Sequence, residues 1–365
     1  MTDQQQLQQD TPTALTPISI TPTSTSTSTS RTLVSASASA APAQPDSASV
    51  TASAVTAAPS SPAPQAELIP AEDPGDDIDD DNFDVDSALG SDADRHAADY
   101  FTPNDEQQLQ SVDISHHYLT VLLDNKLFLA PISPYVQTVL DVGTGDFADT
   151  YPSAQVIGSD LSPCQPEWVP PNVHFEITDA TLQWPWKNDY FDFVHIRYLF
   201  GAIQDWPTLF REAYRCCAPG AWVQSCEADV RFCCDDGTID NEPVLKIWDD
   251  LFAGSAVETG RPFFLQSDAI QERSITEAGF TDVRIFDYKL PVGGWPKNRK
   301  LAEIGEYVRL TLDNDLEGYT FYLWHHILNW PREEYAQFLA SMRRAIYNRR
   351  LHGYMTVRYV YGRKP

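Results

Sequence analysis

The chain is short of positive charge and of long apolar runs, and each shortage excludes a class of protein. Lys and Arg number 25 against 52 Asp and Glu, a formal net charge of −27, and so acidic a chain repels the phosphate backbone of nucleic acids. The one basic cluster falls on a predicted amphipathic helix and is interpreted as a solvated face; it comprises Arg343, Arg344, Arg349 and Arg350. No stretch approaches the roughly 20 apolar residues of a membrane span, and the Gln- and Thr-rich N-terminus lacks the features of a signal peptide. We therefore expect an intracellular protein that contacts neither nucleic acid nor membrane directly.

Cysteine is scarce as well, and its spacing argues against a metal site. The six cysteines include the adjacent pairs Cys216–Cys217 and Cys233–Cys234. No Cys-x-x-Cys pair with downstream ligands occurs. We expect reduced, structural thiols and no bound metal.

The first 95 residues are predicted to form a disordered, low-complexity acidic tail. Ser, Thr, Ala and Pro dominate residues 1–70, which cannot bury enough apolar surface to offset the entropy of ordering. The first 100 residues hold 16 acidic residues against Arg31 and Arg95. Residues 72–86 form a dense acidic run, interpreted as a solubilising linker, with a short interaction segment as the alternative.

Residues 96–365 are predicted to form one domain in which strands and helices alternate. A first helix carries apolar residues from Leu109 to Leu127. Strands are expected at 137–142, 154–159, 173–177, 190–197, 220–226, 282–290 and 353–362. Further helices are expected at 205–217, 243–253, 267–279, 299–313, 319–329 and 331–351. This alternation predicts an α/β fold with a mainly parallel sheet covered on both faces.

The ends of the first two strands carry residues suited to a nucleoside-containing cofactor. TVLDVGTG ends in Asp141, Gly143 and Gly145, and glycine lets backbone N–H groups approach a charged ligand. Asp160 ends the next strand, 19 residues after Asp141, where a carboxylate can accept both hydroxyls of an adenosine ribose.

The third and fourth strand ends extend this pattern. Asp179 and Ala180 follow the third strand, where a carboxylate and a backbone N–H can read an adenine edge. The fourth strand, FDFVHIR, brings His195, Arg197 and Tyr198 toward the cofactor or substrate. Each of these four strand-end motifs alone is a weak indication of a cofactor site, but their order and spacing together are specific.

These motifs resemble the class I S-adenosylmethionine-dependent methyltransferases, and more closely the fungal methyltransferase-like regulators of secondary metabolism that associate with velvet proteins. The resemblance covers about residues 100–365 and is carried by PNDEQQLQSVDISHH, DNKLFLAP, VLDVGTG, PSAQVIGSDLSPCQPEWVPPNVHFEITDA, FDFVHIR, DWPTLFREAYRCCAPGAW, PVGGWP and GRKP. It implies a Rossmann-like sheet of seven strands with the last antiparallel, S-adenosyl-L-methionine as cofactor, and a velvet-type protein partner. It also implies a nuclear or cytoplasmic location.

The resemblance also implies roles for individual residues. It assigns Asp141, Gly143 and Gly145 to the methionine-binding turn and Asp160 to the ribose. It assigns Asp179 with Ala180 to the adenine, and Leu161 and Arg197 to the same cofactor site.

One departure from the family pattern affects the expected cofactor site. Only residues 146–155 separate Gly145 from the next strand at Val156, and Pro152 interrupts them. A parallel crossover normally needs a dozen or more residues; ten extended residues reach about 33 Å, but ten helical ones rise only about 15 Å. At most one or two helical turns fit around Phe147 to Tyr151. The missing helix would have supplied free N–H groups and a positive dipole end, so we expect weakened or absent cofactor binding; a wrongly predicted splice boundary is the alternative origin of the short connection.

Three functions remain open from the sequence. The first is a methyltransferase, whose in-line displacement needs mainly proximity and alignment. The second is a non-catalytic methyltransferase-like scaffold, favoured by the short turn. The third is a nicotinamide-dependent oxidoreductase, because Gly143, Gly145 and Ala148 satisfy the G-x-G-x-x-G/A fingerprint, although Pro152 prevents the long helix that this fingerprint opens.

Candidates for catalysis and substrate binding are fewer. If methyl transfer needs a general base, His195 and His116 are candidates, and Tyr198 is a candidate substrate contact. The alternative for each of the two histidines is a structural role, packed in the core or exposed on the surface. Residues 235–265 are expected to form a helical lid over the substrate. Two aromatic loops, Trp184–Trp186 and Gly293–Pro296, are interpreted as substrate pockets or as rigid packing.

Overall fold

The computed structural model describes residues 62, 64–71, 106–143, 151–161 and 170–365. All of them belong to one compact unit, Ala57–Pro365. The expected disorder of residues 1–61 and 72–95, the acidic run 72–86 and Gly145 lie outside the described residues, as does nearly all of the predicted turn at 147–151.

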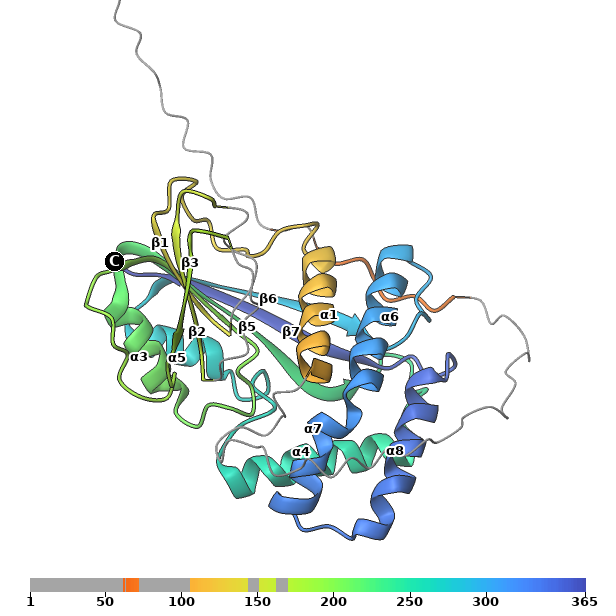
Figure 1. Ribbon diagram of the computed structural model, residues 1–365. Coiled ribbons are helices and arrows are strands. Elements are labelled where there is room, and N and C mark those ends of the chain that lie inside the picture. The colour runs from red at the N-terminus through yellow and green to blue at the C-terminus, as the bar shows by residue number, and fades with distance from the viewer. Residues whose placement is uncertain (1–61, 63, 72–105, 144–150, 162–169) are drawn as a thin grey trace, which may run out of the picture. The chain divides into compact units, whose positions relative to one another are not determined.

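Seven strands form one mixed sheet in the order β3-β2-β1-β4-β5-β7-β6 (Figure 1). The strands are β1 (Thr138–Val142), β2 (Gln155–Asp160), β3 (Val173–Ile177), β4 (Phe191–Arg197), β5 (Cys217–Cys233), β6 (Thr281–Pro291) and β7 (Tyr354–Arg363). The first five pair in parallel, and β7 is antiparallel to both β5 and β6. The predicted Rossmann-like fold with an antiparallel last strand is confirmed.

Helices cover both faces of this sheet. They are α1 (Glu106–Leu122), α3 (Trp206–Cys216), α4 (Pro243–Thr259), α5 (Ile270–Ala278), α6 (Arg299–Asn314), α7 (Leu316–Tyr322), the π-helical turn η2 (Leu323–Ile327) and α8 (Arg332–Tyr347). In Figure 1, α3 lies beside α5 on one side of the sheet and α1 lies beside α6 on the other. Successive residues of a strand point to opposite faces of the sheet. Val194 and Ile196 of β4 therefore pack into the cluster under α3, while the preceding residue Phe193 packs into a separate cluster.

Capping residues explain where several helices begin and end. The Asp205 side chain accepts a hydrogen bond from the Thr208 N–H at 2.9 Å and caps α3, and Asn298 caps α6 through the Leu301 N–H. α1 ends at Leu122, earlier than the apolar pattern to Leu127 predicts. Asp124 and Asn125 follow it with φ of 55° and 64°, and these left-handed residues stop the helix.

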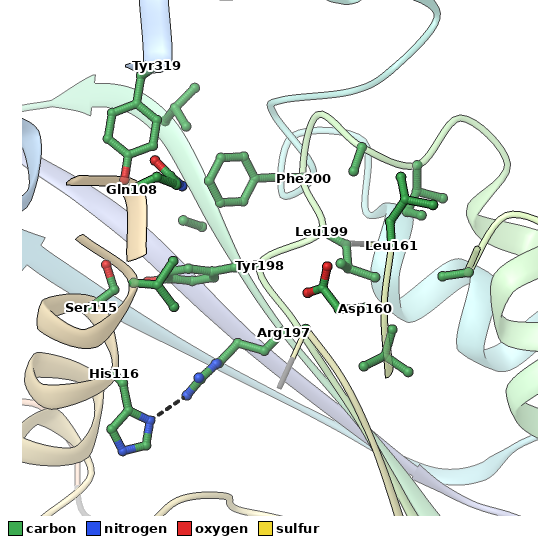
Figure 2. A pocket seen from close by; sticks show the side chains of 18 of the residues that line it. Gln108, Ser115, His116, Asp160, Leu161, Arg197, Tyr198, Leu199, Phe200 and Tyr319 are labelled. Atoms are coloured by element: carbon green, nitrogen blue, oxygen red, sulfur yellow. Dashed lines mark hydrogen bonds between the residues drawn. The ribbon is translucent and has the colours of Figure 1, made fainter. Parts of the chain in front are cut away.

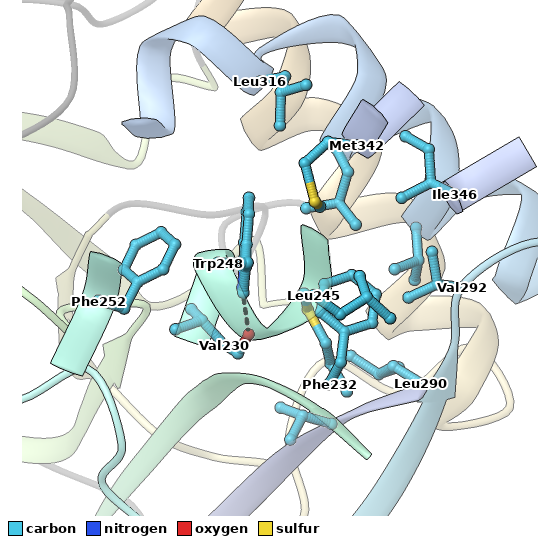
Figure 3. Packing of buried hydrophobic residues seen from close by; sticks show 14 of the residues in the cluster. Val230, Phe232, Leu245, Trp248, Phe252, Leu290, Val292, Leu316, Met342 and Ile346 are labelled. Atoms are coloured by element: carbon cyan, nitrogen blue, oxygen red, sulfur yellow. Dashed lines mark hydrogen bonds between the residues drawn. The ribbon is translucent and has the colours of Figure 1, made fainter. Parts of the chain in front are cut away.

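The long strands β5, β6 and β7 extend the sheet beyond its parallel part. β5 was predicted to end at residue 226, but it continues to Cys233, which pairs with Tyr354. α4, α6 and α8 pack around this extension in a second core, where Trp248, Leu245 and Met342 meet the sheet residues Val230 and Leu290 (Figure 3). Val230 of β5, Leu290 of β6 and Met355 of β7 belong to this extension and form one wall of the candidate site.

A short extended segment, residues 64–71, lies against the domain, although the sequence analysis placed it in the disordered tail. The Gln65 side chain accepts from the Lys289 N–H at 2.6 Å and donates to the Lys289 carbonyl at 2.5 Å. Pro70 bridges to Pro296, and the Ala71 N–H donates to the Trp295 carbonyl at 2.8 Å. The two bonds of Gln65 satisfy backbone groups of the edge strand β6, and the other contacts reach the loop that follows this strand. The composition of the segment did not reveal either contact.

Candidate functional site

The carboxyl ends of β1, β2 and β4 open into one cavity of about 810 Å³. Such an edge is where open α/β sheets bind ligands. Figure 2 shows Gln108, Ser115 and His116 of α1 on one side of this cavity, facing Arg197 and Tyr198, with Asp160 and Leu161 across from them. The residues predicted for the cofactor that line it are Gly143, Asp160, Leu161, Asp179, Ala180 and Arg197.

In the lining of the cavity, the backbone at Gly143 accommodates glycine and no larger residue. Its φ is 84°, and a Cβ on it would lie 2.5 Å from the Arg197 carbonyl oxygen. Its N–H donates to the Ser159 carbonyl at 3.1 Å. Gly143 is thereby held against the ends of β2 and β4, where the three strand ends meet.

Two carboxylates stand on the opposite wall. Asp160 closes β2, and its carbonyl accepts from the Thr178 N–H at 2.9 Å, which fixes the strand ends side by side. The Asp179 Oδ1 atom accepts from the Thr181 N–H at 2.8 Å and from the Thr181 hydroxyl at 2.6 Å. One oxygen of Asp179 thus holds its own turn, which orients the carboxylate for a ligand.

Asp141 and His195 form a buried pair instead of contributing to the cavity lining. Their Cα atoms are neighbours in the β1–β4 register, and His195 Nδ1 lies 3.0 Å from Asp141 Oδ1. Asp141 is 2% exposed and His195 5% exposed, and neither is among the described residues that line the cavity. The alternative of a packed histidine therefore fits His195 better than the role of a base.

His116 holds Arg197 in the cavity. The Arg197 guanidinium donates to His116 Nδ1 at 2.9 Å (Figure 2), so that nitrogen is unprotonated and the proton of a neutral ring is on Nε2. Nε2 lies 3.3 Å from the Thr120 hydroxyl, which itself donates to the His116 carbonyl at 2.9 Å. The lone pair of His116 is occupied by Arg197, so the arrangement suits positioning of a cation rather than proton abstraction.

Tyr198 stands at the middle of the cavity wall. Its backbone is left-handed, with φ of 55°, and its hydroxyl lies 3.0 Å from the hydroxyl of Tyr118 on α1. Burial raises the pKa of Tyr198 well above its usual value and also raises the pKa of Tyr118. Both phenols are neutral at physiological pH and act as hydrogen-bonding groups.

Glu227 of β5 positions the same loop and was missed by the sequence analysis. It is fully buried, and its Oε2 accepts from the N–H groups of Leu199 and Phe200 at 2.8 and 3.0 Å. Burial raises the pKa of Glu227 to about 8, against the opposing effect of these two bonds. An acid directly after a predicted strand, the signal used for Asp160, could have found it.

The region predicted as a lid contributes α4, whose Trp248 and Phe252 line the cavity. The two aromatic loops do not contribute to its described lining. Trp184 is 3% exposed and Trp295 is 4% exposed, and each donates its indole N–H to a backbone carbonyl. Neither loop is thus part of the described lining of this cavity, and Gly293, Gly294 and Trp295 line a separate, smaller pocket of about 110 Å³.

The basic cluster and the cysteines also have structural roles. Arg343 pairs with Asp313 and Glu317, which neutralises the centre of the predicted solvated face. The described cysteines are free thiols, and burial raises the pKa of Cys226 to about 12. Among the described residues no group of three or more His, Cys, Asp or Glu could hold a metal ion. Within the same part of the chain, every helix is too short or too polar to cross a membrane.

The family model for the methyltransferase domain matches residues 114–285. Methyltransferase pytC of Aspergillus terreus is 32% identical over 277 residues, covering 74% of this chain and 85% of that protein. Secondary metabolism regulator LAE1 of Cochliobolus heterostrophus is 30% identical, covering 73% and 90%. Protein-methionine methyltransferase laeA of Emericella nidulans is 30% identical, covering 73% and 72%.

A solved structure of phosphoethanolamine N-methyltransferase 2 of Haemonchus contortus, in complex with S-adenosyl-L-methionine, is 17% identical. It covers 73% of this chain and 55% of that one, with a TM-score of 0.40.

The chain belongs to the methyltransferase domain family. Its fold and the cavity at the carboxyl ends of its strands are those of the class that uses S-adenosylmethionine as methyl donor, as the sequence motifs predicted. Relatives in this family include fungal regulators of secondary metabolism.

Proposed function

We propose that the chain binds S-adenosylmethionine in the 810 Å³ cavity and transfers its methyl group to an acceptor held on the α1 side. The observation that carries this proposal is the convergence of Gly143, Asp160 and Asp179, from three separate strand ends, on one cavity. When bound, the cofactor supplies a methyl group activated by a sulfonium.

The chain's own residues fit the parts of this cofactor. Asp160 can accept the two ribose hydroxyls, and Asp179 together with the Ala180 N–H can read the adenine edge. Arg197, held by His116, provides a cation for the carboxylate of the methionine part. The buried wall built by α1 and α4 excludes water from the transfer.

A second candidate is a scaffold without catalysis, favoured by the short connection of residues 146–155. Under either function we propose a role in secondary metabolism, a velvet-type protein partner, and a nuclear or cytoplasmic location. The names of the relatives from Cochliobolus heterostrophus and Emericella nidulans support the first of these points.

Calorimetric titration of S-adenosylmethionine into the full chain tests the proposal. For the enzyme, we expect micromolar binding by the chain as written, despite the short connection. Asp160→Asn should then lose at least about 10-fold in affinity, since about 1.4 kcal/mol of hydrogen bonding corresponds to that factor. Asp268→Asn is the matched control, because Asp268 is exposed and does not line the cavity.

A second chain with about six residues inserted after Gly145, restoring the family length, separates the two candidates. Binding by both chains supports the enzyme. Binding by the extended chain alone supports either the scaffold or a wrongly predicted splice boundary, which sequencing of the transcript distinguishes. Binding by neither chain refutes the proposed cofactor site.

A further inference from the structure

The part of the cavity away from the cofactor residues is an apolar chamber inside the domain. We define the chamber by the residues Leu119, Val230, Trp248, Phe252, Leu312 and Met355, which all line the cavity. They come from α1, β5, α4, α6 and β7. Each is at most 7% exposed, so the chamber reaches into the core shown in Figure 3.

The size of the cavity leaves room for a second ligand. Its volume of about 810 Å³ lies in the upper part of the range of roughly 300–1,000 Å³ that ligand pockets span. The cofactor residues occupy the ends of β1, β2, β3 and β4. The chamber is therefore free to hold the methyl acceptor.

The depth of the chamber limits what this acceptor can be. Trp248 and Phe252 are each 1% exposed, and a folded protein surface cannot reach walls so deep in a core. Part of the mouth is apolar as well, since Leu109 and Val112 of α1 are 38% and 41% exposed and line the cavity. A small apolar molecule matches both the mouth and the walls.

The polar groups at the boundary of the chamber limit the acceptor atom. The hydroxyls of Tyr118 and Tyr198, 3.0 Å apart, can hydrogen-bond an oxygen, but both phenols are neutral and cannot remove a proton. The lone pair of His116 Nδ1 is occupied by Arg197. Asp113 and Asp205 line the cavity only at its exposed rim.

We propose that the chamber binds a small apolar molecule bearing a phenolic or enolic hydroxyl, and that this oxygen is the methyl acceptor. This inference rests on the proposed function. The acceptor enters as the phenolate or enolate, its proton having passed to bulk water. Its oxygen forms a bond to the methyl carbon while the carbon–sulfur bond breaks and leaves its electron pair on sulfur, which becomes a neutral thioether.

The test is a titration of 2-naphthol into the full chain saturated with S-adenosylmethionine, followed by naphthol fluorescence. We expect saturable binding by the wild type and a loss of at least about 10-fold in Leu312→Trp, which fills the chamber from α6. The matched control is Leu310→Trp on the same helix, because Leu310 is 42% exposed and lies outside the lining. The affinity for S-adenosylmethionine, measured separately, should be the same in all three chains.

Absence of naphthol binding in a wild type that binds S-adenosylmethionine would overturn the inference, as would equal naphthol affinity in the two Trp variants. Transfer of a labelled methyl group to polypeptide that Leu312→Trp leaves unchanged would also overturn it, in favour of a protein acceptor. If the wild type binds naphthol but no S-adenosylmethionine, the proposed function fails while the chamber stands as a ligand site.

Discussion

At the residue scale, the strand register decided roles that the sequence left open. Asp141 and His195 each belong to a motif, but their pairing follows from the alignment of β1 with β4, which places their Cα atoms opposite each other. Gly143, in contrast, was recognisable in the sequence, because a glycine after a buried strand commonly marks a turn against a ligand. Glu227 could have been noted as an acid after a predicted strand, but nothing in the neighbouring sequence reveals that its side chain is fully buried.

Replacing Glu227 with Gln should make the protein more stable at high pH. The pKa of Glu227 is raised in the folded protein to about 8 from 4.5. Between these values the folded chain binds the additional proton, so the contribution of Glu227 to stability is present below pH 4.5 and lost as the pH rises through about 8. Gln keeps an oxygen that can accept from the Leu199 and Phe200 N–H groups and carries no charge.

We compare the free energy of unfolding of Glu227→Gln with that of the wild type. The difference should increase between about pH 4.5 and pH 8 and then level off. The total increase should be roughly 2–4 kcal/mol. Urea unfolding at pH 5, 7 and 9 measures this difference. Asp249→Asn is the control, because burial raises the pKa of Asp249 to about 6 and its difference should level off there. A difference that does not change with pH would show that Glu227 is ionised in the folded protein.

At the element scale, most helices and strands could be predicted because their apolar periods and caps are local. β3 was predicted at its observed bounds, β4 differs by one residue at its start, and β7 differs by one residue at each end. The length of β5 was underestimated, because its extension to Cys233 depends on pairing with β7, near the C-terminal end of the sequence. Residues 64–71 were missed for the same reason, because their bonds to Lys289 and Trp295 join segments more than 200 residues apart.

Removal of the cap of α6 should destabilise the helix that forms one wall of the chamber. Asn298→Ala leaves the Leu301 N–H, now 3.2 Å from the Asn298 Oδ1 atom, without its partner. We expect a loss of about 1 kcal/mol in the free energy of unfolding, measured by urea denaturation. Lys297→Ala is the control, since the Lys297 side chain is exposed and its backbone bond to Ile69 is retained. Equal effects of the two substitutions would argue against the cap.

At the scale of the whole molecule, the net charge of −27 dominates the electrostatics. Like charges repel in the compact state, and salt screens them. Raising NaCl from about 0.05 to 0.5 M shortens the Debye length from roughly 14 to 4 Å and should raise the thermal midpoint by a few degrees. Exposed pairs such as Lys300 with Asp124 lose at most about 1 kcal/mol in the process. A midpoint that falls with salt would show that ion pairs outweigh the repulsion.

The sequence by itself determined the fold class and the strand ends that bear the cofactor residues, because both depend on local periodicity and on the order of short motifs. Only the tertiary structure decided which of these residues face the cavity. Burial and strand register depend on residues far apart in the sequence. They determine that Asp141 pairs with His195 and that Arg197 hydrogen-bonds His116. They also determine that Glu227 accepts hydrogen bonds from the N–H groups of Leu199 and Phe200. The apolar chamber has the same origin, since its walls come from five elements that no segment of the chain brings together alone.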